Sequence, residues 1–204
     1  MLFDARTLGF ASVATMFVIT PGVGTAVITR TVVERGREAG LAVIAGLITG
    51  SVLYALGTAL GLAALLVAFP RVLRAVQLIG AVYVGWLGIA TLRSAWRIEP
   101  AGGALPPAAA NVYRTGLTTS LLNLMLAVFY LTVIPQFVAP GDNLLRRTLL
   151  LAAVHLTIAA TWMLVLVAGI AHLTESLASA VVRRRIALVT GAVLLLLAIR
   201  LVVR

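Results

Sequence analysis

The 204-residue sequence contains no cysteine and no lysine, and only six of its residues are acidic. The lack of cysteine excludes disulfides, thiol redox chemistry and thiolate metal sites. Charged residues make up 11% of the chain, whereas about 25% is typical of a soluble domain. Hydrophobic residues make up 62% and leave too little polar material to cover a surface that faces water. The composition therefore places the chain in a membrane.

At about 20 residues per span, the chain has room for six transmembrane helices and little else. The sequence predicts an all-α membrane protein with a single integral membrane domain over 1–204. The predicted spans are 8–28, 41–69, 72–92, 117–138, 149–173 and 186–203. The charged stretch 30–37 is predicted to be a loop.

The positive charge follows the ends of these spans. Nine of the sixteen arginines fall on the side that holds 30–37, and seven fall on the side of the termini. The excess favours a cytoplasmic position for 30–37 and places both termini outside the cytoplasm. Arginines at span ends are interface anchors and topology signals, so we expect no nucleic-acid partner.

The last spans of the two halves resemble each other. Segment 78–93 aligns without gaps with 189–204 at an offset of 111, and Gly80-Ala81-Val82 falls on Gly191-Ala192-Val193. The sequence predicts a first repeat over about 1–98, a Pro/Gly-rich linker over about 99–113 and a second repeat over about 114–204. An odd number of spans in each half makes the two repeats inverted, an arrangement that recurs in secondary transporters.

The first span is interrupted at Thr20-Pro21-Gly22-Val23-Gly24. Proline inside a helix costs about 3 kcal/mol, and broken backbone survives in a bilayer only where protein or a water-filled cavity covers it. The amides after Pro21 begin a half-helix whose positive dipole end suits a carboxylate. The predicted substrate-binding residues are Thr20, Pro21, Gly22, Gly24, Thr25, Ser51, Tyr54 and Asn123.

Two features of other spans have alternative interpretations. Asn123 is the predicted counterpart of the Pro21 break in the fourth span, and it either contacts substrate or backbone there or forms an interhelical hydrogen bond. In the second span, small residues share one helical face, either for packing or beside the polar Ser51 and Tyr54. This face comprises Gly46, Gly50, Gly57 and Gly61.

His155 is the ionisable residue that lies deep within a predicted span, because all six acidic residues lie at span ends or in loops. An imidazole with an ordinary pKa of about 6.5 suits a proton carrier, so we predict that His155 couples transport to protons. The alternative is a neutral imidazole that bonds to a neighbouring helix. His155 and His172 have no acidic partner in their span, so we expect no metal site, no cofactor and no enzyme activity.

Several motifs together resemble the LysE/RhtB family of amino-acid exporters. They are Thr20-Pro21-Gly22, the stretch 35–41 (RGREAGL), the stretch 78–83 with Gly88, and 116–138 ending in Pro-Gln-Phe-Val. The resemblance covers nearly the whole chain. It implies a six-helix secondary transporter that exports amino acids or related zwitterionic metabolites across the bacterial cytoplasmic membrane.

The sequence departs from the family pattern at three places. Val23 stands where the family has a second proline, Asn123-Leu124-Met125 stands where it has Asn-Pro-Lys, and Ser51 stands where many members have an acidic residue. A site without fixed charge would suit a zwitterion or neutral polar solute. The alternatives are a transporter of another solute, such as an inorganic cation, on the same scaffold, or a membrane scaffold protein that transports nothing. A small-molecule substrate and the lipid bilayer are the expected partners, and a homo-oligomer is left open.

Overall fold

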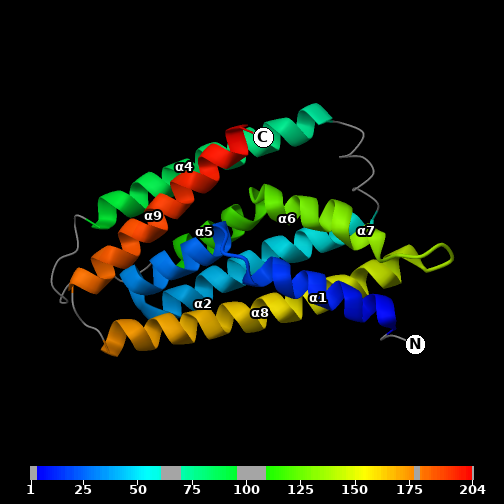
Figure 1. Cartoon of the computed structure of the whole chain (residues 1–204), viewed down its shortest axis with the longest axis horizontal. Coiled ribbons are helices and arrows are strands. Elements are labelled where there is room, and N and C mark those ends of the chain that lie inside the picture. Colours follow the sequence, from blue (N-terminus) through cyan, green and yellow to red (C-terminus); the bar gives the residue numbers. More distant parts are fainter. Residues whose placement is uncertain (1–3, 61–69, 96–108, 177–179, 204) are drawn as a thin grey trace.

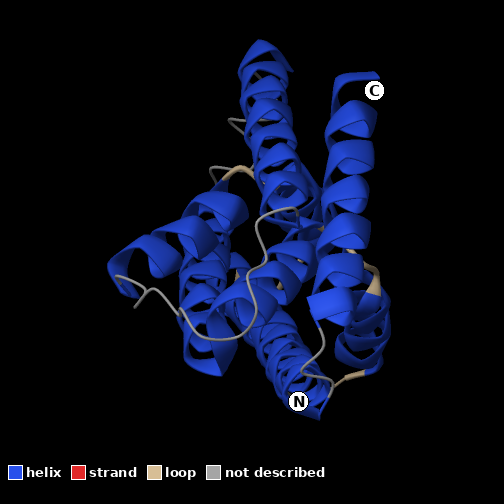
Figure 2. Ribbon diagram, turned by 90° about the vertical axis from the view of Figure 1, so that its left-hand side faces the viewer, coloured by secondary structure: helices blue, strands red, loops and turns tan. Residues whose placement is uncertain are grey.

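The computed structural model describes residues 4–60, 70–95, 109–176 and 180–203, and this part of the chain is all-helical (Figure 1, Figure 2). The elements are α1 (Ala5–Ile19), α2 (Val23–Ala59), α4 (Pro70–Ala95), α5 (Ala109–Leu121), α6 (Leu124–Val128), the π-helical turn η1 (Phe129–Val133), α7 (Ile134–Gln136), α8 (Leu144–Ser176) and α9 (Ala180–Val203). The predicted all-α class is confirmed.

Within the described residues, two helices contain a stretch that is long and apolar enough to cross a membrane, Val23–Ala59 and Leu144–His172. The pair Asn111–Leu121 and Leu124–Gln136, which is bent by 52°, makes a third span if it is counted as one. Helix α1 (Ala5–Ile19) and the segment Ala81–Arg93 of α4 are shorter apolar helices. Six spans and an inverted repeat therefore stay predictions. Of the predicted linker 99–113, only 109–113 are described, and they are helical in α5.

Gly36 reverses the chain within α2. Its φ of 82° and ψ of −178° interrupt the helix, and a positive φ of this kind favours glycine. The segment 37–59 then folds back on the segment 23–35, so that Gly40 lies against Val32, and Figure 1 shows the reversal. The prediction of a loop over 30–37 is wrong for 30–35, which stay helical up to the turn.

The second segment of α2 packs closely on α5. A side chain at Gly46 would collide with the backbone of Tyr113 and Leu117, and one at Gly50 would collide with Ser120. Gly116 faces the backbone of α2 in the same way. The packing interpretation is confirmed for Gly46 and Gly50, because small residues let helices approach closely in a membrane. Gly61 lies outside the described residues.

Helices α4 and α9 lie side by side (Figure 1). Gly88 faces Leu195, and a Cβ at Gly191 would lie 2.7 Å from Cγ of Leu92. Near the other end of the pair, Arg74 donates to the carbonyl of Val202 (3.2 Å). These contacts follow the two helices in opposite directions, so α4 and α9 are antiparallel. They carry the two segments that align in sequence, and an inverted repeat requires this orientation.

The described interior consists of two separate clusters. The aliphatic core contains only valine, alanine, isoleucine and leucine among its buried members and joins α2, α4, α5, α8 and α9. The aromatic core is built on Phe10, Phe129 and Tyr130 and joins α1, α2, α6, η1, α7 and α8. The bundle thus has two halves that are packed by different kinds of side chain.

The break between α1 and α2 and the break between α5 and α6 both fall between these two cores. Before the first break, α1 supplies Phe10 to the aromatic core, and after it Val23 belongs to the aliphatic core. In the fourth span the order is reversed, since Val112 of α5 is in the aliphatic core and Leu126 of α6 is in the aromatic core. The two breaks therefore mark one boundary across the bundle.

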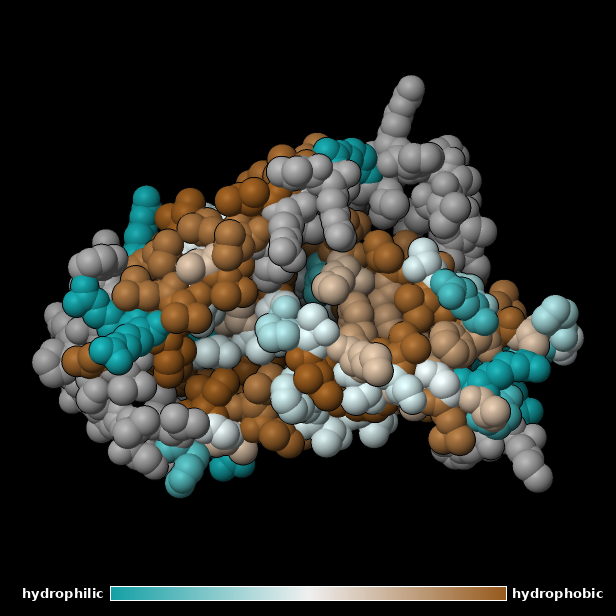
Figure 3. Space-filling model, viewed as in Figure 1, coloured by the Kyte–Doolittle hydropathy of each residue, from teal (hydrophilic) through white to brown (hydrophobic). Residues whose placement is uncertain are grey.

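The surface has the distribution expected of a membrane protein. In Figure 3 hydrophobic residues cover much of the middle of the visible face, and hydrophilic residues gather mostly toward the two ends. Large apolar side chains are exposed along the helices, for example Leu8, Val82 and Leu196. In a bilayer such side chains face lipid.

Candidate functional site

The first break has the geometry that proline imposes. Helix α1 ends at Ile19, and the hydroxyl of Thr20 donates to the carbonyl of Met16 (2.7 Å). Gly22 caps α2 without a side-chain acceptor, and the first intrahelical bond runs from the amide of Ala26 to Gly22 (3.0 Å). The first amides of α2 therefore have no acceptor on their own helix. Thr20 and Pro21 are exposed on the described chain.

The second break confirms the predicted interruption of the fourth span. Helix α5 ends at Leu121 and α6 begins at Leu124, although neither a proline nor a lysine follows Asn123. Oδ1 of Asn123 accepts hydrogen bonds from the amides of Met125 (3.1 Å) and Leu126 (3.3 Å). Asparagine is a strong N-cap, so this side chain starts the new helix by itself. Its NH2 group contacts no acceptor in the described part of the chain.

A line of polar and aromatic side chains runs from the second break into the aromatic core. The hydroxyl of Tyr54 donates to the carbonyl of Leu121 at the end of α5 (2.6 Å). The Tyr54 ring stacks on Tyr130, with ring centroids 6.1 Å apart. The hydroxyl of Tyr130 lies 3.0 Å from Nδ1 of His155. Tyr54 and His155, which the sequence places in different spans, are thus connected through Tyr130.

His155 lies deep inside the protein, with 2% of its surface exposed. Its ring lies 4.8 Å from Phe129 and 6.0 Å from Phe17 of α1, measured between centroids. The bond to Tyr130 satisfies one ring nitrogen, which is what a buried polar group requires. The partner of His155 is thus a tyrosine hydroxyl on the fourth predicted span. The role of His155 in proton coupling stays a prediction.

The remaining predicted residues differ in what they offer to a ligand. Ser51 is buried, and its hydroxyl donates to the carbonyl of Leu47 on its own helix. Gly24 lies beside the Leu47 side chain, and the carbonyl of Thr25 accepts from the hydroxyl of Thr29 (2.9 Å). Ser51 therefore has a structural bond, whereas the Gly24 and Thr25 region lies directly after the first break.

Tyr130 is the main residue that the sequence analysis missed. It is fully buried and lies in η1, and its carbonyl accepts from the hydroxyl of Thr58 (3.4 Å). Single π-helical turns inside helices are frequent at functional sites. In the sequence a tyrosine in a span resembles a lipid-facing aromatic residue, and the useful signal was its place seven residues after Asn123.

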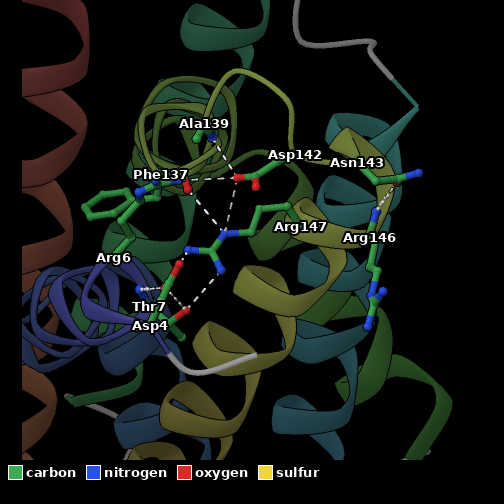
Figure 4. Close-up of polar contacts among 9 residues, drawn as sticks. All are labelled: Asp4, Arg6, Thr7, Phe137, Ala139, Asp142, Asn143, Arg146 and Arg147. Carbon is green, nitrogen blue, oxygen red and sulfur yellow. Dashed lines mark hydrogen bonds and ion pairs between the residues drawn. The ribbon is translucent and has the colours of Figure 1, made fainter. Parts of the chain in front are cut away.

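An ion-pair network joins the start of α1 to the start of α8 (Figure 4). Arg147, with 8% of its surface exposed, donates to Oδ1 of Asp4 (2.9 Å), to the hydroxyl of Thr7 (3.1 Å) and to the carbonyl of Phe137 (3.3 Å). Its Nε also lies 4.0 Å from Oδ2 of Asp142. These contacts tie three separate parts of the chain together, and we call this end of the bundle the Arg147 end.

Asp4 has two functions in this network. Its carboxylate caps α1 by accepting from the amide of Thr7 (2.9 Å), and it pairs with Arg147. The Thr7 amide and the Arg147 guanidinium together hold the pKa of Asp4 well below its usual range. Asp4 therefore keeps its charge at a lower pH than a free aspartate does.

Comparison with known proteins assigns the chain to a family. Residues 15–204 match the family described as LysE type translocator. An uncharacterized membrane protein of Bacillus subtilis (strain 168), YrhP, is 26% identical over 169 residues, which are 78% of this chain and 80% of the relative. An uncharacterized membrane protein of Pseudomonas aeruginosa is 32% identical over 129 residues, 61% of this chain and 60% of the relative.

A further relative has a name that states a function. The homoserine/homoserine lactone efflux protein of Salmonella typhimurium (strain LT2) is 28% identical over 169 residues, 81% of this chain and 79% of that protein. No solved structure matches the chain. The relatives named as membrane proteins and the apolar helices confirm the predicted location in a bacterial membrane. The chain belongs to the LysE-type translocators, a family of membrane transporters rather than of enzymes.

Proposed function

We propose that this protein exports amino acids or related small zwitterionic metabolites across the bacterial cytoplasmic membrane as a secondary transporter. The observation that carries the proposal is the alignment of the two helix breaks, at 20–22 and at 122–123, with the boundary between the aliphatic and aromatic cores. Interrupted helices near mid-membrane are where many transporters hold substrate, and two separately packed halves can move against each other about such a boundary. Two inverted three-helix repeats would produce this arrangement.

The proposed substrate site lies at this boundary. The amides after Pro21 would bind a carboxylate, and the NH2 group of Asn123 and the hydroxyl of Tyr54 would bind the polar remainder. Thr20, Gly22, Gly24, Thr25 and Ser51 complete the proposed set. His155, with Tyr130, is the proposed proton-coupling group.

The relatives support the substrate class. Two matched proteins are named for efflux of homoserine and homoserine lactone, which are small polar amino-acid derivatives. A transporter of inorganic cations on the same scaffold would need acidic ligands. No group of three or more histidine, cysteine or acidic residues able to hold a metal ion occurs within the residues that the structure describes. The amino-acid proposal is therefore favoured over the cation alternative.

The proposal is tested by export from cells that have been loaded with peptides. Cells that express the protein should release one or more amino acids faster than cells without it, when external and internal levels are measured. No change for any amino acid would contradict amino-acid export and favour another solute or a scaffold role.

The break itself is tested by Pro21→Ala. This change restores a backbone donor and removes the clash with the preceding turn, so the helix should continue and export should fall at least about tenfold, with membrane abundance unchanged. The matched control is Pro140→Ala in the loop before α8, which should export normally. Normal export by Pro21→Ala would exclude the break as part of the site.

A further inference from the structure

A cavity of about 150 Å³ opens at the end of the bundle opposite the Arg147 network. Four elements contribute to it, and we call this end the cavity end. The lining residues are Val27, Arg30, Thr31, Glu34 and Arg35 of α2, Trp86 and Leu87 of α4, Asn111, Val112 and Thr115 of α5, and Leu194 of α9. An engineered protein cavity of about this volume holds a molecule of about six non-hydrogen atoms, so a small metabolite fits.

Three charged side chains line this cavity. Nε of Arg30 donates to Oε1 of Glu34 (3.0 Å), and the two side chains are 20% and 22% exposed. Arg35 is exposed beside them. The cavity therefore has two guanidinium groups and one carboxylate, a formal charge of +1.

The Arg30 pair leaves bonding capacity for a ligand. A guanidinium has five N–H donors, and Nε is the group of Arg30 that bonds within the described chain. Its terminal nitrogens are the atoms that bind a carboxylate in the bidentate manner. The apolar walls formed by Val27, Leu87 and Leu194 strengthen such a contact because they lower the local dielectric.

We propose that this cavity is a loading site for a small zwitterion, separate from the breaks at the middle of the bundle. Arg30 and Arg35 bind its carboxylate, and Glu34 binds its ammonium group. Asn111 and Thr115 face an uncharged polar side chain. This inference rests on the proposed export function, and it identifies the kind of solute that the cavity binds.

The position of the cavity agrees with the direction of export. The arginine excess favours a cytoplasmic location for the side that holds Arg30 and Arg35. A cavity on that side receives solute from the cytoplasm, and the Arg147 network joins separate parts of the chain at the other end. The two guanidinium groups disfavour a solute with a second positive charge and an inorganic cation.

The absence of cysteine permits a direct test with the full-length protein. A single cysteine introduced as Thr115→Cys should react with a charged maleimide, and L-homoserine should slow the reaction. L-Homoserine lactone lacks the free carboxylate, so it should need at least about tenfold higher concentration for the same protection. Glu38→Cys, which lies outside the cavity, should be labelled at the same rate with or without either compound.

Matched variants then test each charge. In the cysteine-free protein, Arg30→Gln should weaken binding of radiolabelled L-homoserine at least about tenfold, whereas Arg37→Gln should leave it unchanged, since Arg37 does not line the cavity. Glu34→Gln and Glu38→Gln form a second matched pair, since Glu34 lines the cavity and Glu38 does not. The binding measurement also decides the question if Thr115→Cys folds poorly.

The outcomes separate this inference from the proposed function. If cells that express the protein export homoserine but Arg30→Gln binds it as well as Arg37→Gln does, the loading site is wrong and the exporter stands. Equal protection by homoserine and its lactone would overturn the recognition of carboxylate by the arginines. If no amino acid is exported or bound, the proposed function fails together with the loading site.

Discussion

The two ends of the bundle use the same kinds of residue for different purposes. At the Arg147 end, one buried guanidinium bonds to groups from α1 and from the chain between α7 and α8, with partners up to 143 positions away in sequence. At the cavity end, Arg30 pairs with Glu34 on the same helix, four positions away. The contacts of Arg147 join separate elements of the chain, whereas the Arg30–Glu34 pair joins two residues of one helix.

The cores beside these ends differ in the same sense. Phe10, Phe129 and Tyr130 fill the half next to the Arg147 end, and valine, leucine and alanine fill the half next to the cavity. Phe10 packs edge-on against Phe137, whose carbonyl also binds Arg147. Large rings and a long-range ion pair fix one half, and the cavity lies in the other half.

The largest loss of stability is expected for Arg147→Met. Removal of the buried guanidinium takes away its bonds to the Asp4 carboxylate and to the Phe137 carbonyl, so several contacts between separate parts of the chain are lost at once. Thermal unfolding in detergent should show a clearly lower midpoint for this variant. Arg146→Met is the control, because Arg146 is exposed and adjacent, and its midpoint should stay close to that of the wild type. Equal midpoints for the two variants would mean that the network does not hold this end together.

The sequence predicted the helical fold and both breaks, but not the difference between the ends. Pro21 and Asn123 act on the backbone within a few residues, so local chemistry was enough to locate the breaks. The Asp4–Arg147 pair joins positions that only the folded chain brings together. At the cavity end, the charged residues near Gly36 resembled a loop, so the sequence did not indicate the Arg30–Glu34 pair. Their spacing of four positions is nevertheless the one that aligns two side chains on a helix.

The line of polar side chains that runs from the second break into the aromatic core is tested through Tyr130 and His155. Tyr130→Phe removes the hydroxyl that bonds to Nδ1 of His155 and should cost about 1 kcal/mol in thermal unfolding. If His155 couples export to protons, His155→Gln should export at a rate that no longer changes with the external pH. Tyr130→Phe is the comparison, because it keeps the imidazole. Export by His155→Gln with the pH dependence of the wild type would assign His155 a purely structural role.

A smaller effect with a defined pH range is expected for Asp4→Asn. Because the folded-state pKa of Asp4 is lowered, its contacts stabilise the protein above the ordinary value of about 3.9 and are lost as the pH falls below it. The difference in unfolding midpoint between the wild type and Asp4→Asn should be constant between about pH 7 and pH 5 and shrink below about pH 4. In an Arg147→Met background, Asp4→Asn should have less effect, since the ion pair is already gone. A difference that grows as the pH falls would contradict the assigned contacts.

The smallest effect on stability is expected for Arg30→Gln, and this result would sharpen the comparison most. A partly exposed pair four positions apart on one helix contributes about 0.3–0.5 kcal/mol, so the unfolding midpoint should hardly change. The same variant should lose homoserine binding, whereas Arg147→Met should lose stability in the absence of any ligand. A guanidinium that adds little to the fold but lines a cavity has bonding capacity for a solute, and one buried among four protein groups does not. If Arg30→Gln destabilised the protein as much as Arg147→Met does, both arginines would have a structural role. The proposal that the cavity selects the substrate would then be wrong.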